Sequence, residues 1–267
     1  MECYEYVFCV LVYRNVLDVE RLVYSINKNV NNAKIVIVNS FFDEISKKEI
    51  NEHAVKLGCD FLNVENKGYS YGNNKGIEYI CDKYNFRYLV ISNPDIIVRR
   101  FPKNELISED CITGPLIKTI RGKMQNPYWA IENYLGEYIL YFGFKYNIRC
   151  LRIMVYAINR LIRIAYVALV NLCRKECFKV YACHGSFIVI PNGILKQLLP
   201  VFDDEMFLFN EEALLAKKAK KRKIKICINK NIKVIHKEDG SLEMSNVNEN
   251  NRQRESFLYY FEKRIKL

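Results

Sequence analysis

Short apolar runs alternate with amphipathic segments through the first part of the chain. Four runs are rich in β-branched and aromatic residues, as expected of buried strands, at residues 6–13, 33–38, 61–64 and 88–91. Three intervening segments carry apolar residues at helical spacing, at residues 18–29, 45–57 and 73–84. This alternation predicts an α/β fold with a mostly parallel sheet that is flanked by helices and joined by right-handed crossovers.

Beyond residue 95 the regular alternation stops. Strands are predicted at residues 111–115, 187–190, 224–228 and 232–235, and helices at 193–199, 210–222 and 254–265. No internal repeat and no linker rich in proline or glycine interrupts the chain. We therefore expect a single domain over residues 1–267, with an inserted amphipathic helical segment at about 134–177 and a C-terminal helix within 246–267.

Composition limits the classes of partner. The chain of 267 residues is long enough to bury a substantial core, and half of its residues are apolar. Its formal charge of +11 favours an anionic partner: nucleic acid, a phosphorylated substrate or lipid headgroups. The ten cysteines include no C-x-x-C pair, which favours reduced thiols over a zinc site. Glu2 and Glu5 stand where a signal peptide would be basic, so we expect a cytoplasmic protein.

Two segments near the middle of the chain favour a ligand site. The first, Asn66–Gly76, holds three glycines among small polar residues, and such a backbone can turn sharply and approach a ligand closely. The second, Asn93–Asp95, follows the apolar run at 88–91. Each alone is also typical of an ordinary turn. Asp95 would lie at the carboxyl end of a strand, where α/β sheets bind ligands, and a carboxylate there suits a metal ion that holds a phosphorylated substrate.

Two later segments add acidic residues and a histidine. In Val201–Glu212 the adjacent carboxylates Glu211 and Glu212 open a predicted helix. The helix dipole alone favours acids there, and one of them could equally act as a general base that takes a proton from a hydroxyl group. His236 follows the predicted strand at 232–235. A histidine in such a place is more often structural, although imidazole is a good partner for a carboxylate in a metal site.

Taken in order, these segments resemble those of the family 2 glycosyltransferases of the GT-A fold. The closer likeness is to the rhamnosyltransferase-like branch that assembles bacterial surface polysaccharides. The matching segments are Asn66–Gly76, Asn93–Asp95, Gly185–Phe187, Phe202–Glu212 and, more loosely, His236–Ser241. The likeness covers roughly residues 6–241, and ordered segments are far more specific together than any one of them.

The resemblance implies the transfer of a sugar, with inversion, from a nucleotide-diphosphate donor to a lipid-linked oligosaccharide or polysaccharide acceptor. Residues 1–100 would then bind the nucleotide, and residues 101–245 would form the acceptor and catalytic half. The positions implied in donor binding are Tyr13, Asn15, Asn39, Asn66, Gly68, Gly72, Asn73, Asn93 and Asp95.

The resemblance also implies a metal site and a base. Asp95 and His236 would hold a divalent metal ion, Mg²⁺ or Mn²⁺, across the diphosphate. Glu212 aligns with the expected base, and Glu211 would bind or position the acceptor. The family usually has Glu-Asp at these two positions, so which carboxylate is the base is left open. Asn39 stands near the place of an aspartate that contacts the nucleotide base, and the nucleotide is therefore left open as well.

The most apolar stretch, residues 151–172, has the length of a membrane-spanning helix. Arg160 and Arg163 would each cost roughly 2.5–3.5 kcal/mol near the bilayer centre, which disfavours insertion. On a helical projection the arginines gather within an arc of roughly 100°. A basic amphipathic helix of this kind favours peripheral contact with an anionic membrane, such as the inner face of the cell membrane. The alternative is a helix packed on the enzyme with its arginines in water.

Two other classes of protein fit the sequence less well. A sugar nucleotidyltransferase should carry a glycine-rich loop after the first strand, and residues 13–17 contain no glycine. A basic nucleic-acid-binding protein would gather aromatic and basic residues on one surface. The 19 tyrosines are instead spread along the chain, and the acidic segment at 203–212 would have no role. We therefore expect no nucleic-acid partner.

Overall fold

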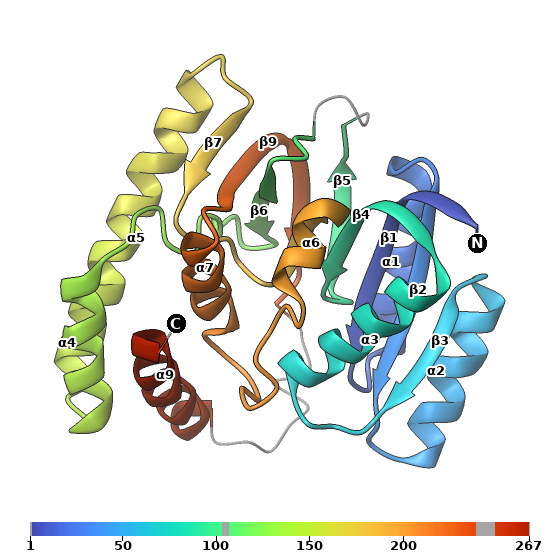
Figure 1. Cartoon of the computed structure of the whole chain (residues 1–267), viewed down its shortest axis with the longest axis horizontal. Helices are drawn as coiled ribbons and strands as arrows, with labels where there is room; N and C mark the ends of the chain where they lie inside the picture. Colours follow the sequence, from blue (N-terminus) through green and yellow to red (C-terminus); the bar gives the residue numbers. More distant parts are fainter. Residues whose placement is uncertain (1, 103–106, 239–248, 267) are drawn as a thin grey trace.

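The computed structural model describes residues 2–102, 107–238 and 249–266 (Figure 1). The strands are β1 (Cys3–Val12), β2 (Ala33–Ser40), β3 (Asp60–Val64), β4 (Asn85–Ser92), β5 (Ile96–Arg100), β6 (Cys111–Thr119), β7 (Cys177–Val180), β8 (Phe187–Pro191) and β9 (Lys225–His236). The helices are α1 (Val16–Asn29), α2 (Glu44–Lys56), α3 (Tyr69–Lys83), α4 (Tyr134–Lys145), α5 (Arg149–Leu172), α6 (Asn192–Leu198), α7 (Glu211–Lys221) and α9 (Glu249–Lys266).

One sheet runs through the described part of the chain, in the order β3-β2-β1-β4-β8-β6-β9-β5, and β7 pairs with β9 beside this path. β1 pairs in parallel with β2 and β4, β2 with β3, and β6 with β9. β8 is antiparallel to β4 and β6, while β5 and β7 are antiparallel to β9. Six of the nine strands therefore run in one direction and three in the other. The predicted α/β fold with a mostly parallel sheet is confirmed.

Helices cover both faces of the sheet, which explains why its strands are continuous apolar runs. Side chains alternate along β1 between two buried clusters. Val7 and Cys9 share a cluster with residues of α3, α6 and α7, whereas Phe8 and Val10 share one with residues of α1 and α2. Because the interior of each strand is committed to packing, the polar residues that follow the strand ends are the ones available for chemistry.

The segment at 224–235 forms one strand, β9, rather than the two short strands predicted from the sequence. β9 pairs with β6 along its length and crosses a single register shift, so the irregularity lies in the pairing and does not end the strand. β9 also pairs with β5, in a register that sets His236 opposite Ile96. This register brings His236 beside Asp95, which is far from it in sequence.

The helices α4 and α5 pack against each other along one side of the molecule, on the left in Figure 1. The C-terminal helix α9 packs against α4 and α7. The three helices and α7 share a buried cluster that includes Phe144, Val155, Leu214 and Phe257. This helical layer packs beside the sheet, on the side where α7 begins with Glu211 and Glu212.

Candidate active site

The candidate site lies at one edge of the sheet. β1, β2, β4, β6 and β9 run in the same direction, so their carboxyl ends meet at that edge, and the antiparallel β8 begins there. The structure thus gathers the predicted segments that follow β1, β2 and β4, together with His236 at the end of β9. Asp239–Ser241, the last part of the predicted histidine segment, lie outside the described residues.

Asp95 and His236 form a buried pair at this edge. The Asp95 carboxylate lies 3.1 Å from His236 Nε2, and the two residues are only 3% and 8% exposed. On its other side, His236 Nδ1 lies 2.7 Å from Gln125 Oε1. The Gln125 amide nitrogen in turn donates to Glu238 Oε1 at 2.8 Å, which fixes the orientation of the amide. Gln125 Oε1 therefore accepts from Nδ1–H, and the other ring nitrogen, Nε2, faces the Asp95 carboxylate, where the two can share a proton or a cation.

A lone pair and a carboxylate at this distance repel each other unless a proton or a cation lies between them. The donor set of one carboxylate oxygen and one imidazole nitrogen suits Mn²⁺ or Mg²⁺, and Gln125 is the kind of outer partner that orients a metal-binding histidine. No group of three or more His, Cys, Asp or Glu side chains suited to a metal is found among the described residues. Asp95 and His236 can accordingly supply only part of a coordination shell, as is usual where phosphates and water complete it.

Glu211 and Glu212 begin α7 on the opposite side of the start of β8. Glu212 Oε1 accepts a hydrogen bond from the Gly185 backbone N–H at 2.9 Å, and a Cβ on Gly185 would lie 2.8 Å from that oxygen. Glu211 is 4% exposed, and its Oε1 has no hydrogen-bond partner within the described part of the chain. Burial raises the pKa of both carboxyl groups, and for Glu211 the neighbouring charge of Glu212 raises the pKa further.

His184 connects the two ends of the site and was not identified from the sequence. Its Nδ1 accepts from the Ser186 backbone N–H at 3.2 Å, which leaves the ring proton on Nε2. The His184 ring lies 5.7 Å from that of His236, centroid to centroid, and the Gly185 beside it binds Glu212. Burial lowers the pKa of His184 to about 3, so the ring is neutral at physiological pH. Its position just before the Gly-Ser-Phe segment was the available signal.

The predicted residues of the first loop form a helix cap and an aromatic platform. Asn15 caps α1, because its Oδ1 accepts from the Asp18 N–H at 3.2 Å. Tyr13 stacks edge-on against Phe42 at 5.7 Å, and the Arg14 guanidinium lies 3.9 Å from the Phe42 ring centre. Phe42 is 43% exposed, so this cluster offers an apolar and cationic surface next to the carboxyl ends of β1 and β2.

A salt bridge that the sequence did not reveal ties this loop to the metal-binding candidates. Asp18 is 2% exposed and lies 2.5 Å from the Lys237 ammonium group. The Lys237 backbone N–H donates to the Asp95 carbonyl oxygen at 3.0 Å. Lys237 therefore joins α1 to Asp95, and only the fold brings the two partners of this ion pair together.

The three asparagines predicted to bind the donor at the ends of β2, β3 and β4 differ in exposure and hydrogen bonding. Asn66 is exposed, and its Oδ1 accepts from the Ser40 hydroxyl at 3.0 Å. Asn39 is buried at the end of β2 and donates to Asn63 at 2.6 Å. Asn93 is half-buried, and its backbone N–H donates to the Ser186 carbonyl oxygen at 2.9 Å.

Gly72 and Asn73 face the sheet instead. A Cβ on Gly72 would contact the Leu11 side chain, so the absence of a side chain lets α3 lie close to β1. Asn73 is fully buried, and its amide nitrogen donates to the Tyr69 carbonyl oxygen at 2.9 Å. Gly68 has a φ of +101° and caps α3. In the structure these residues serve the packing of α3, and donor binding at them stays a prediction.

Gly68 permits a close approach of two backbone segments. A Cβ there would overlap the backbone of Phe207, whose carbonyl oxygen accepts from the Tyr69 N–H at 2.7 Å. Because its φ also disfavours any L side chain, we expect Gly68→Ala to lower the free energy of unfolding by about 1–3 kcal/mol in chemical denaturation. Gly193→Ala is the matched control, since no atom lies within 4 Å of the added Cβ. An equal, small effect of both substitutions would contradict this account of the contact.

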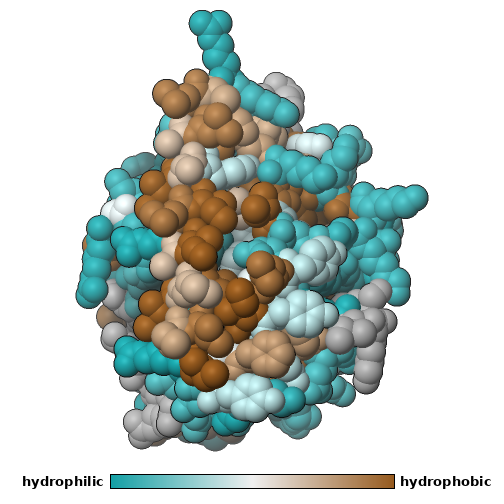
Figure 2. All heavy atoms as spheres, turned by 90° about the vertical axis from the view of Figure 1, so that its left-hand side faces the viewer, coloured by the Kyte–Doolittle hydropathy of each residue, from teal (hydrophilic) through white to brown (hydrophobic). Residues whose placement is uncertain are grey.

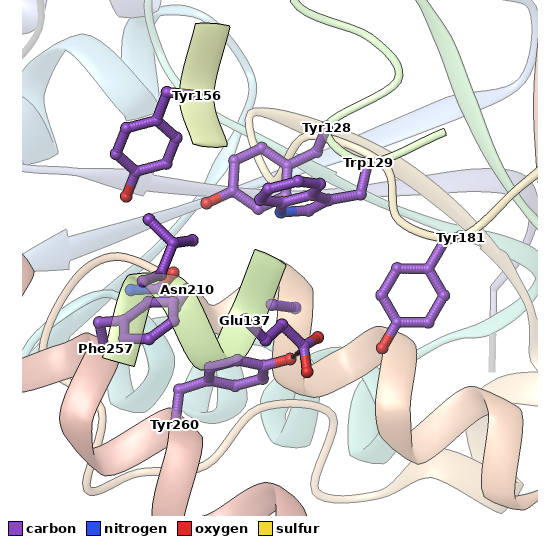
Figure 3. A pocket seen from close by; sticks show the side chains of 10 residues that line it. Tyr128, Trp129, Glu137, Tyr156, Tyr181, Asn210, Phe257 and Tyr260 are labelled. Carbon is purple, nitrogen blue, oxygen red and sulfur yellow. Dashed lines mark hydrogen bonds between the residues drawn. The ribbon is translucent and has the colours of Figure 1, made fainter. Parts of the chain in front are cut away.

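An aromatic pocket lies beside α7, between α4, α5 and α9 (Figure 3). Tyr128, Trp129 and Tyr181 approach it from loops near the sheet, and the Tyr260 hydroxyl donates to Glu137 Oε1 at 2.7 Å. Its free volume of about 10 Å³ is close to the least that holds one water molecule. The pocket is accordingly a packed aromatic cluster that supports α7, and it has no room for a sugar ring.

No protein-family model and no curated protein sequence matches the chain. Among solved structures, the fold is similar to that of GalNAc-T7 crystallised with UDP, GalNAc and Mn²⁺, with a TM-score of 0.61 and 14% identity over 87% of this chain and 44% of that chain. It is also similar to TarS of S. aureus, with a TM-score of 0.57 and 11% identity over 97% of this chain and 43% of that chain.

These similarities define the class of fold. Both neighbours are glycosyltransferases of the GT-A type, and the chain has the GT-A fold of that class. The chain spans less than half the length of either protein, 44% and 43%. Sequence identity at this level carries the fold alone, so the chemistry has to be argued from the side chains that the fold brings together.

Proposed function

We propose that the protein is an inverting glycosyltransferase that uses a nucleotide-diphosphate sugar. The observation that carries this proposal is the buried Asp95–His236 pair, 3.1 Å apart, at the same edge of the sheet as Glu212. GalNAc-T7 provides independent support, because its structure has the same fold and holds UDP and Mn²⁺. The basic charge of the chain also suits a phosphorylated donor.

In this mechanism Glu212 takes the proton from the acceptor hydroxyl as its oxygen forms a bond to the anomeric carbon of the donor. The bond from that carbon to the diphosphate breaks, and the nucleoside diphosphate leaves with the electron pair. Asp95 and His236 would hold the divalent ion, which offsets the charge that develops on the leaving diphosphate. The Gly185 N–H keeps the Glu212 carboxyl oriented, at 2.9 Å, while the burial that raises its pKa makes it a stronger base once ionised.

For the acceptor we propose a lipid-linked oligosaccharide or polysaccharide, as in the rhamnosyltransferase-like branch that the motif order resembles. We propose that the enzyme acts in the cytoplasm. In support of this location, all ten cysteines are free, and the buried Cys111 lies beside Cys227 without forming a disulfide, as suits a reducing compartment.

A thermal-shift screen tests the donor class. Purified protein is melted with UDP-, dTDP- and GDP-sugars, each with Mn²⁺, with Mg²⁺ and with a chelator. We expect one nucleotide to raise the melting temperature by about 5–10 °C, and only when metal is present. A ligand at a hundredfold excess over its Kd stabilises the folded protein by about 2.7 kcal/mol. For a domain of this size, each kcal/mol raises the melting temperature by about 2–4 °C. The absence of a shift with every donor, together with a shift on adding nucleic acid, would contradict the proposed function.

A further inference from the structure

One side of the molecule carries a continuous apolar surface along α4 and α5 (Figure 2). We call it the α4–α5 ridge and define it by six exposed aliphatic and aromatic side chains: Leu135, Phe142, Ile153, Leu161, Ile164 and Leu172. Leu135 is 72% exposed, Leu161 67% and Leu172 85%. A contiguous apolar surface of this kind on a folded protein marks a contact with a partner.

The helix α5 turns some of its polar groups toward the protein and exposes many apolar side chains. Arg163 Nη1 donates to the Gln125 carbonyl oxygen at 3.0 Å, and Asn159 Nδ2 donates to that of Tyr128 at 3.0 Å. Arg152 lies over the Phe144 ring of α4, 5.0 Å from its centre. The sequence left open whether the arginines lie at a membrane or in water, and the structure divides them: Arg163 binds a backbone carbonyl of a neighbouring loop, whereas Arg149 and Arg160 are exposed.

The inward contacts argue against α5 as a spanning helix. α5 is the only helix in the described part of the chain that is long and apolar enough to cross a membrane, by length and composition. Crossing would require Asn159 and Arg163 to leave their carbonyl partners and enter hydrocarbon, where each polar group loses its hydrogen bonds. The arrangement fits a helix that stays packed on the protein and presents one side to an interface.

The charge of the residues around α5 indicates what kind of partner binds the ridge. No Asp or Glu occurs between Tyr138 and Lys175, and the exposed charged residues in or next to α5 are basic through that interval. They are Lys145, Arg149, Arg160, Arg174 and Lys175. A second copy docked on the same ridge would bring these cations together, whereas an anionic lipid surface neutralises them.

We propose that the α4–α5 ridge is a docking surface for an anionic lipid bilayer, with its apolar side chains at the level of the headgroups and its arginines and lysines on lipid phosphates. The backbone carbonyls of Gln125 and Tyr128 accept hydrogen bonds from α5. The side chain of Gln125 also contacts His236, and the ring of Tyr128 packs against His184. Docking would thus hold the candidate active site near the bilayer surface. The lipid contact is a property of this surface and does not depend on the proposed activity.

Vesicle flotation tests this surface. The protein is mixed with vesicles of phosphatidylcholine, or of phosphatidylcholine with phosphatidylglycerol, and the bound fraction is measured. We expect binding to the anionic vesicles, weakened at least about tenfold by the double substitution Leu161→Glu with Ile164→Glu. The matched control is Ile45→Glu with Val55→Glu on α2, whose side chains are 73% and 69% exposed and lie outside the ridge. Equal binding of both variants, or no binding of the unmodified protein, would overturn the proposal.

Three further measurements make the result specific. Arg149→Gln with Arg160→Gln should reduce binding to anionic vesicles and remove the difference between the two vesicle types. Light scattering without lipid should show no change of mass in the ridge variant, and a dimer that this variant dissociates would overturn the proposal in favour of a second copy. The donor-dependent thermal shift should be the same in the ridge variant. If the ridge variant loses lipid binding but keeps the donor-dependent thermal shift, the ridge is the lipid-binding surface. If the unmodified protein binds lipid but shows no donor-dependent shift, the proposed activity is wrong and the lipid contact stands.

Discussion

Glu212→Gln is expected to lower the rate of sugar transfer by about 10²–10⁴-fold while the donor still binds. The amide keeps an oxygen for the Gly185 N–H, which now lies 2.9 Å from Glu212 Oε1, so the geometry of α7 should persist. The amide cannot accept the acceptor proton, so only the chemical step is lost. The rate is measured by donor turnover with acceptor, and binding by the metal-dependent thermal shift.

The two neighbouring glutamates are separated by the same assay. If Glu211→Gln lost activity on that scale while Glu212→Gln retained it, the base would be Glu211, contrary to this assignment. Glu205→Gln is the control, since Glu205 is exposed in the same segment and contacts the Tyr259 hydroxyl at 2.7 Å. The pH profile provides a further check. Burial raises the pKa of Glu212, and the base acts ionised, so activity should fall on acidification at a higher pH than for an ordinary glutamate.

The first half of the sheet follows directly from the sequence because both of its faces are buried. Runs such as 6–13 and 88–91 are apolar throughout, and the helices between them are amphipathic, so strand, helix and parallel pairing are all specified locally. The second half is less regular because its partners are distant in sequence. The pairing of β9 with β5 and β6, which makes one strand from two apolar runs, depends on register that no local pattern contains.

The site shows the same division. Asp95, His236 and Glu212 stand in short segments whose order was recognisable, and the fold brings Asp95 and His236 together. Gln125 gave no signal, because a single glutamine in a polar loop has many surface roles, and only the contact with His236 Nδ1 reveals its function in orienting the imidazole. The Asp18–Lys237 ion pair was equally hidden, since its partners are 219 positions apart.

The orientation of α5 could not be predicted for a different reason. Helical periodicity identifies two sides of a helix but does not say which one contacts the protein. The usual rule buries the apolar side. Here Arg163 and Asn159 face inward because they find carbonyl partners in the loop that contains Gln125 and Tyr128, and Arg149 and Arg160 stay exposed beside outward apolar side chains. Exposed apolar side chains next to exposed cations suit a helix at an anionic lipid interface, and the packing of α5 on the enzyme is compatible with that role.

Asp95→Asn should remove both donor binding and transfer. The substitution preserves the shape of the Asp95 side chain, whose carboxylate lies 3.1 Å from His236 Nε2. It removes the negative charge that would attract and bind a divalent cation. We expect the metal-dependent part of the thermal shift to vanish and transfer to fall by about 10³-fold or more, close to the scale on which loss of one electrostatic contact to a transition state is measured. Asp110→Asn, an exposed aspartate before β6, is the control for charge alone.

The two substitutions together test the division of roles within the site. Glu212→Gln should leave a protein that binds donor and metal as before, whereas Asp95→Asn should leave one in which metal no longer strengthens donor binding. If Asp95→Asn retained the full metal-dependent thermal shift, Asp95 and His236 would form a structural ion pair. A proton, and not a metal ion, would then lie between the Asp95 carboxylate and His236 Nε2, which are 3.1 Å apart. If both substitutions abolished donor binding equally, the carboxylate on α7 would serve the donor site, and the proposed proton transfer would have to be assigned to another residue.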